Sequence, residues 1–270
     1  MADTREVADR FHVRSADGTA IAVWAEGSGP PLVLVHGALN DHTSDARFVA
    51  ALADRVTTFA IDRRGRGGSG DGQAYAIERE FEDVAAVVDA VSGPTGRPVA
   101  VWGHSFGADC AMGGAALTSR VSHLVLYEPG LGCEIADEAI EAVEAALAAG
   151  DREGALVATL ARIVELTEDE IAFVRASPGW DARLAAVPVV PREIRAERDW
   201  AYRPGQFDTI TAQALVLDGT ASPAAQRAAT KQAAQAVPGA KLHQLEGHSH
   251  IAHRTHPAAV ADLVVGFVLS

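Results

Sequence analysis

The amino-acid sequence predicts an α/β protein with a doubly wound, mostly parallel sheet and a helical cap inserted after the sixth strand. Apolar runs without polar alternation recur along the 270 residues, and helical patterns lie between them. One stretch, residues 133–206, contains helical patterns and no convincing strand. Because strands that alternate with helices imply βαβ units, we expect this stretch to be an insertion over one end of the sheet.

The strands are expected in this order. A hairpin at residues 11–15 and 20–26 comes first, and a glycine- and proline-containing break at residues 27–31 follows it. Continuous apolar runs, typical of strands buried on both faces, then recur at residues 32–35, 56–61, 99–102, 123–127, 214–217 and 242–245. We therefore assign residues 1–132 and 207–270 to the core and residues 133–206 to the cap.

The helical segments carry apolar residues on one face. The clearest stripe has spacings of four, three, four and three positions, at Ile77, Phe81, Val84, Val88 and Val91. The last helix has Pro257 near its start and an apolar face of Val260, Leu263, Val264 and Phe267. Inside the insertion, Thr167 and Glu170 have the spacing of a capping box, which predicts a helix start at Thr167.

Composition excludes several classes of protein. With 23 basic and 36 acidic residues the net charge is −13, so we expect neither nucleic acid nor a membrane as a partner. Two cysteines, Cys110 and Cys133, are too few for a disulfide framework and favour a cytoplasmic setting. The N-terminus lacks the apolar core of a signal peptide, and no apolar run approaches the ~18 residues of a membrane span. The oligomeric state stays open.

Much of the negative charge lies in the insertion, since residues 131–206 carry 8 arginines against 15 carboxylates. A solvated outer face is the first interpretation of this charge, and electrostatic selection of substrates is the alternative. The apolar residues of the insertion are expected to pack its helices together more than to contact a ligand: Ile135, Leu147, Leu156, Leu160, Ile163, Phe173 and Trp180.

The sharpest chemical signal is Gly103-His104-Ser105-Phe106-Gly107, which follows an apolar run and precedes a small-residue stretch at residues 108–116. A sharp turn from strand to helix strains the backbone of the serine, and glycine at both flanks avoids a clash. The hydroxyl then projects near a helix N-terminus, where developing negative charge is favoured. This context predicts a nucleophilic Ser105 rather than an ordinary glycine-rich turn with a buried serine.

With this motif the chain resembles the α/β-hydrolase superfamily over nearly its whole length. His36-Gly37 matches the family's oxyanion loop, residues 62–69 match its glycine-rich loop after the fourth strand, and residues 103–107 match its nucleophile elbow. The insertion lies where the family carries its cap. Because a phosphate-loop lysine is absent, the arginines of residues 62–70 are expected to brace the loop through Asp–Arg pairs.

The resemblance implies which histidine serves the serine as general base. The family pattern Gly-x-x-His falls on Gly247 and His250, so we expect His250 to be the base, with His248 as the second choice. His253 and His256 are expected to line the start of the last helix.

The backbone N–H groups of Phe106 and Ala38 are expected to bind the oxyanion, with Gly37 as an alternative to Ala38. No cofactor is implied. The histidines lie on separate loops without a carboxylate at helical ligand spacing, so no metal site is expected either.

The acid of the triad departs from the usual family pattern. The family usually carries Gly-x-x-Asp after the seventh strand, but here Ser222 takes the place of that aspartate. Some members carry the acid after the sixth strand, where this chain has Glu128. A carboxylate at the end of a neighbouring parallel strand can reach the histidine from the other side. We expect Glu128 to orient His250, with Asp218 as the rival.

The resemblance thus implies a serine hydrolase for an ester, thioester or lactone of a small to medium hydrophobic molecule, acting through an acyl-enzyme. The serine nucleophile argues against haloalkane dehalogenases and epoxide hydrolases, and a cap without lysine argues against hydroxynitrile lyases. An acyltransferase, a carbon–carbon bond hydrolase, a cofactor-free haloperoxidase and a non-catalytic ligand-binding protein remain alternatives. The pocket is expected between the strand ends and residues 133–206, with the cap selecting the substrate.

Overall fold

The computed structural model describes residues 9–93, 96–131, 133–200 and 202–270. These residues form one sheet of eight strands, in the order β1-β2-β4-β3-β5-β6-β7-β8. β2 pairs antiparallel with β1 and with β4, and the other neighbours are parallel, which confirms the predicted doubly wound, mostly parallel sheet. The strands are β1 (Asp9–Arg14), β2 (Ala20–Gly27), β3 (Pro31–Val35), β4 (Thr57–Ile61), β5 (Val99–His104), β6 (Val121–Tyr127), β7 (Gln213–Gly219) and β8 (Lys241–Leu245).

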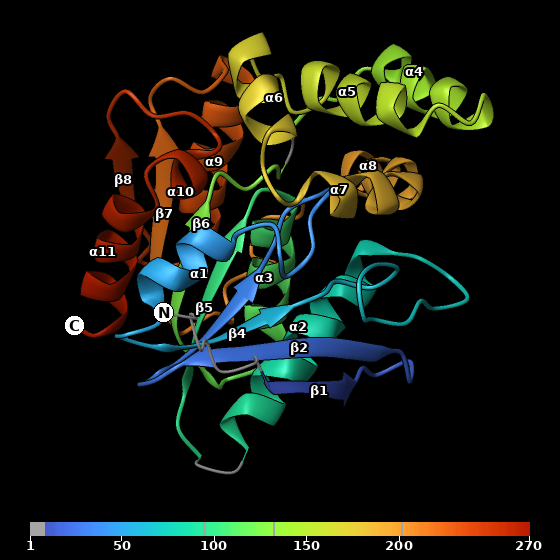
Figure 1. The fold of residues 1–270 in the computed structure, drawn as a ribbon. Coiled ribbons are helices and arrows are strands. Elements are labelled where there is room, and N and C mark those ends of the chain that lie inside the picture. The colour runs from blue at the N-terminus through green and yellow to red at the C-terminus, as the bar shows by residue number, and fades with distance from the viewer. Residues whose placement is uncertain (1–8, 94–95, 132, 201) are drawn as a thin grey trace, which may run out of the picture.

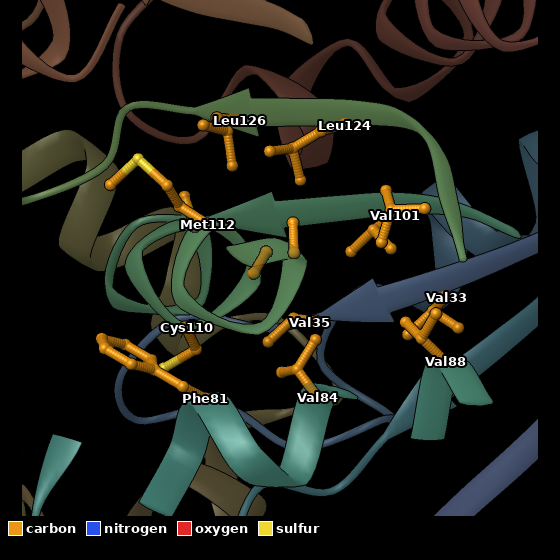
Figure 2. Packing of buried hydrophobic residues seen from close by; sticks show 14 of the residues in the cluster. Val33, Val35, Phe81, Val84, Val88, Val101, Cys110, Met112, Leu124 and Leu126 are labelled. Atoms are coloured by element: carbon orange, nitrogen blue, oxygen red, sulfur yellow. The ribbon is translucent and has the colours of Figure 1, made fainter. Parts of the chain in front are cut away.

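Alternate residues of the central strands face two separate layers of helices. Val33 and Val101 belong to a core with α2 (Ile77–Ser92) and α3 (Phe106–Leu117), in which Val88 of α2 lies beside Val33 (Figure 2). Their neighbours Leu32 and Ala100 belong to a second core with α1 and α11. Burial on both faces explains why these strands are unbroken apolar runs in the sequence. The helices around the sheet are α1 (Ala46–Leu52), α2 (Ile77–Ser92), α3 (Phe106–Leu117), α9 (Ala224–Ala236), α10 (Ala252–Thr255) and α11 (Pro257–Val268).

β8 differs from the prediction of a strand buried on both faces. It lies at the edge of the sheet, where Leu242 is 41% exposed and Leu245 is buried. An edge strand has one neighbour and less cover from helices, so the prediction for residues 242–245 is wrong in this respect.

Helices fill the chain between β6 and β7, and no strand occurs there among the described residues. They lie beyond the carboxyl ends of the parallel strands, in the upper part of Figure 1. The capping box predicted at Thr167 and Glu170 is present at the start of α6. The residue limits of core and cap stay a prediction. The insertion consists of α4 (Asp137–Ala148), α5 (Arg152–Arg162), α6 (Glu168–Arg175), α7 (Trp180–Ala186), a 3-10 turn (Val187–Val189) and α8 (Val190–Asp199).

The insertion has its own apolar core, and two residues of the sheet domain belong to it. Leu39 and Ile251 pack with Leu156 and Leu160 of α5. Ile135, Leu147, Ile163 and Trp180 pack at the edge of this core, whereas Phe173 is 37% exposed.

Two predictions concern the relation to membranes. In the part of the chain that the structure describes, no helix has both the length and the apolar character needed to cross a bilayer. Residues 1–8, which carry most of the N-terminal segment predicted to lack a signal peptide, lie outside the described residues.

Candidate active site

Ser105 lies at the sharp turn between β5 and α3, as the motif predicts. Its backbone has φ 54° and ψ −134°, in a region that residues other than glycine rarely adopt. A Cβ at Gly103 would lie 2.6 Å from the Cα of Ala108, and one at Gly107 would lie 2.3 Å from the carbonyl oxygen of His36. Glycine at both flanks therefore lets the elbow pack closely against β3 and α3.

Glu128 and His250 come together although 122 residues separate them. The Nδ1–H of His250 donates to Oε2 of Glu128 at 2.6 Å, since a carboxylate can only accept. Oε1 of Glu128 accepts from the backbone N–H of Gly219 and from the hydroxyl of Ser222, each at 2.7 Å. Ser222 occupies the position of the usual aspartate. Its hydroxyl thus holds Glu128, the carboxylate that is expected to act in place of that aspartate.

Asp218, the rival acid, points elsewhere. Its carboxylate accepts two hydrogen bonds from Arg227, at 3.2 and 3.1 Å, and one from Gln244 at 3.1 Å. Successive side chains of a strand face opposite sides of the sheet. The position of Gly219 faces Glu128, so the side chain of Asp218, one residue earlier, points to the other side. The structure brings Glu128, and not Asp218, to His250.

The other histidines of the C-terminal segment occupy different places. His248 is half-buried, with its ring 4.3 Å from that of His256, which caps α11 at the expected helix start. His253 does not line that start, because it lies in α10 with a fully buried side chain. Its Nε2 is 3.2 Å from the carboxylate of Asp45, and burial lowers its pKa to about 4.

His104, which was not among the predicted site residues, supports the loop of His250. Its Nε2–H donates to the carbonyl oxygen of His250 at 2.9 Å. Burial, with His253 and His250 close by, lowers the pKa of His104 well below its usual value, so the ring stays neutral. The hydroxyl of Tyr127 donates to the carbonyl of Ser249 in the same loop. A histidine inside the elbow motif was the sequence signal for this role.

Ala38 and Phe106 line the same cavity as Ser105 and His250. Within the described ranges, neither backbone N–H donates a hydrogen bond, so both can meet an oxyanion. His36 fixes the loop before Ala38, since its Nδ1–H donates to the Gly37 carbonyl at 2.8 Å and its Nε2 accepts from the N–H of Arg63 at 3.2 Å. Burial beside Arg66 and Arg63 lowers the pKa of His36 to about 3, which keeps the ring neutral.

A cavity of about 180 Å³ opens beside Ser105, between the strand ends and the insertion, where it was predicted. Three carboxylates and one arginine of the insertion line it: Glu134, Glu165, Glu197 and Arg162. Part of the acidic charge of the insertion therefore faces the cavity rather than bulk solvent. Ile135 and Ile163 line it as well, so these two apolar residues combine packing with contact to the cavity.

Glu197, which lines the cavity, interacts with the buried carboxyl group of Asp109 behind it. Burial raises the pKa of Glu197 to about 7, and burial together with Glu197 raises that of Asp109 well above its usual value. Two carboxyl groups this close cannot both ionise easily, so the pair holds a proton near neutral pH.

The arginines of the loop after β4 are paired, mostly with carboxylates of other elements. Arg63 makes two hydrogen bonds to Glu80 of α2, at 3.1 and 2.8 Å. Arg64 makes two to Asp83, both at 2.7 Å, and one to Asp17 at 2.9 Å. The arginines therefore brace the loop, as predicted, but glutamates also take part in the pairs. Asp62 of the loop itself accepts from other groups and does not pair with an arginine among the described residues.

One cluster in the described part of the chain has metal-ligand geometry. Donor atoms of Asp41, His42 and Asp62 lie within 4.8 Å of one another. Asp62, however, already accepts hydrogen bonds from His42, Trp24 and the backbone N–H of Gly68, and Asp41 accepts from Thr43. This donor set is occupied by the fold itself and fits a metal poorly.

Comparisons with known proteins extend this description. The model of the Alpha/beta hydrolase family matches residues 32–263. The 2-(acetamidomethylene)succinate hydrolase of Mesorhizobium japonicum is 26% identical to this chain, over 96% of each. The crystal structure of an alpha/beta hydrolase from Sphaerobacter thermophilus is 34% identical, with a TM-score of 0.81, and covers 96% of this chain and 100% of its own. An enol-lactonase from Burkholderia xenovorans is 23% identical, with a TM-score of 0.75 and coverage of 96% and 100%.

Proposed function

The chain belongs to the alpha/beta hydrolase family, and we propose that it is a serine hydrolase that cleaves an ester, a thioester or a lactone. One observation carries this proposal. The hydrogen bond from His250 to Glu128 lies at the cavity that Ser105 also lines, which supports the roles of base, orienting acid and nucleophile for these three groups.

The proposed reaction uses groups of this chain at each step. The Ser105 hydroxyl attacks the carbonyl carbon while Nε2 of His250 takes its proton, and Glu128 stabilises the resulting imidazolium. The N–H groups of Phe106 and Ala38 bind the oxyanion that forms. His250 then protonates the leaving group, and water activated by the same histidine releases the acid and restores Ser105.

The size of the cavity supports a small or medium substrate. About 180 Å³, lined partly by Ile135 and Ile163, suits a compact molecule with an apolar part. A screen over p-nitrophenyl esters of graded chain length and simple lactones would define the range. The screen should include 2-(acetamidomethylene)succinate, because the relative from Mesorhizobium japonicum is named for it.

A fluorophosphonate probe tests the nucleophile directly. The folded protein should be labelled at Ser105, and Ser105→Ala should abolish labelling. His250→Ala should slow labelling strongly, because the serine loses its base. Ser28→Ala, which removes an exposed hydroxyl between β2 and β3, is a matched control that should still be labelled. Folded protein that resists the probe, or is labelled at another serine, contradicts the proposal.

A further inference from the structure

A second, smaller recess adjoins the proposed catalytic groups. Its volume is about 30 Å³, and Ser105, Ala38 and His250 line both it and the larger cavity. Its wall carries two arginines, Arg183 of α7 and Arg254 of α10. The two cavities beside Ser105 therefore differ in charge, since carboxylates predominate in the larger one and guanidinium groups in the recess.

Arg183 is buried, and its guanidinium has no carboxylate partner in the part of the chain that the structure describes. Its exposed fraction is 1%, and the described residues place no carboxylate oxygen within 4.0 Å of its guanidinium. The hydrogen bond found for this group is a long one, from Nη1 to the hydroxyl of Ser177 at 3.4 Å. Burial, with the nearby Arg254, lowers the pKa of Arg183 to about 9, the direction expected of a cation that lacks a neutralising partner. Such a charge is costly to bury, and a bound anion would remove the cost.

Arg254 is only partly neutralised. Its Nε donates to Asp45 at 2.8 Å, while its Nη2 is buried and makes no hydrogen bond within the described residues. The histidines nearby, His104 and His253, are neutral because burial lowers their pKa values. Asp41, the other carboxylate near Arg183, accepts hydrogen bonds from Thr43 instead. Two guanidinium groups thus face one paired aspartate, and the recess keeps a positive charge.

We propose that this recess binds a carboxylate of the substrate, so that the protein acts on esters or lactones with a free carboxylate a few bonds from the scissile carbonyl. A single water fills about 10–15 Å³ of such a cavity, so about 30 Å³ accommodates the two oxygens of one carboxylate. The planar fork of a guanidinium matches that group in shape and charge. The acidic lining of the larger cavity disfavours an anion there, which fixes the orientation of the substrate. The inference rests on the proposed hydrolysis at Ser105.

Binding to protein that cannot turn the ligand over tests the recess. In Ser105→Ala protein, calorimetry should show that methyl hydrogen succinate binds about 10-fold or more tightly than methyl 4-methylpentanoate, whose isopropyl group replaces the carboxylate. Adding Arg183→Gln should remove this preference. Arg183→Lys should keep part of it, because the charge remains and the fork is lost. Arg175→Gln, which removes an exposed arginine of α6 paired with Glu153, should leave the preference intact.

Two results overturn the proposed recess: equal binding of the two esters by Ser105→Ala protein, or a preference that survives Arg183→Gln. If Arg183→Gln does not fold, the comparison of the two esters and the Arg183→Lys variant still decide.

Turnover by unaltered protein separates this inference from the proposed function. A binding preference without hydrolysis of either ester and without labelling of Ser105 contradicts the function alone. Hydrolysis of both esters with equal kcat/KM contradicts the recess alone.

Discussion

Arg63, in the loop after β4, and Arg183, beside Ser105, are both fully buried, yet among the described residues only Arg63 has carboxylate partners. Burial alone lowers the pKa of Arg63, but the groups around it, the Glu80 carboxylate first, outweigh burial and raise it. For Arg183 burial prevails and the pKa falls. The contrast teaches that a buried arginine indicates a ligand site only when the fold leaves it unpaired, because paired arginines already satisfy their charge.

The paired arginine also connects the insertion to the elbow. Nη2 of Arg63 lies 3.1 Å from Glu193 of α8, and Arg66 pairs with the same glutamate. The guanidinium of Arg63 lies over the ring of Phe106, 4.4 Å from its centroid. This network therefore links α2, α8 and the residue that follows Ser105, which is a structural rather than a ligand-binding role.

The largest effect is expected from Arg63→Met. It leaves Glu80 and Glu193 buried without their shared partner, so the free energy of unfolding should fall by about 3–5 kcal/mol. Urea denaturation measures this. Arg79→Met, which removes a partly exposed arginine paired with Glu82 within one helix, should cost about 0.5 kcal/mol or less. If the two variants lose equal amounts of free energy of unfolding, the network around Arg63 has no special structural role.

Glu197 and Asp109 are buried carboxyl groups, and they extend the comparison of buried arginines to acidic groups. The folded protein raises the pKa of Glu197 from its ordinary value of 4.5 to about 7. The stabilisation that comes from the protonated carboxyl group is therefore complete below pH 4.5 and is lost as the pH rises through about 7. Glu197→Gln cannot ionise. Relative to unaltered protein, the variant should therefore gain about 2 kcal/mol in free energy of unfolding between pH 5 and pH 8. If the variant and the unaltered protein differ in free energy of unfolding by the same amount at pH 5 and pH 8, the carboxyl pair does not hold a proton near neutral pH.

The smallest effect on stability is expected from Arg183→Gln. No ion pair within the described residues is lost and a poorly satisfied charge is removed, so the free energy of unfolding should change by less than about 1 kcal/mol or rise. Urea denaturation beside Arg63→Met gives the contrast. If Arg183→Gln lost as much stability as Arg63→Met, Arg183 would be a brace as well, and the distinction between the two arginines would fail.

The sheet and the elbow could be predicted because local sequence encodes them. Strands buried on both faces must be continuously apolar, and a serine at φ 54° needs small flanking residues. β8 was described wrongly because an edge position depends on strand order, which a single apolar run does not reveal.

The candidate site was predictable only where a motif marks it. Ser105 and His250 have such motifs, and Glu128 followed from its place at the end of β6. The bond from Ser222 to Glu128 depends on the register of β6 with β7, in which Tyr127 pairs with Leu217. Whether Arg183 has a partner likewise depends on how α7 packs on the core, and no local pattern encodes that.

The proposed mechanism depends on which carboxylate orients His250, and kcat/KM of variants of Glu128 and Asp218, measured on the best ester of the panel, decides between the two. Glu128→Gln should lower kcat/KM by roughly 10²–10⁴-fold with the fold intact, as expected when a histidine loses its orienting carboxylate. Asp218→Asn should stay within about threefold of the unaltered protein, because Asp218 bonds to Arg227 and Gln244 rather than to His250. The opposite order, with Asp218→Asn inactive and Glu128→Gln nearly unaffected, would contradict the role of Glu128 and assign it to Asp218.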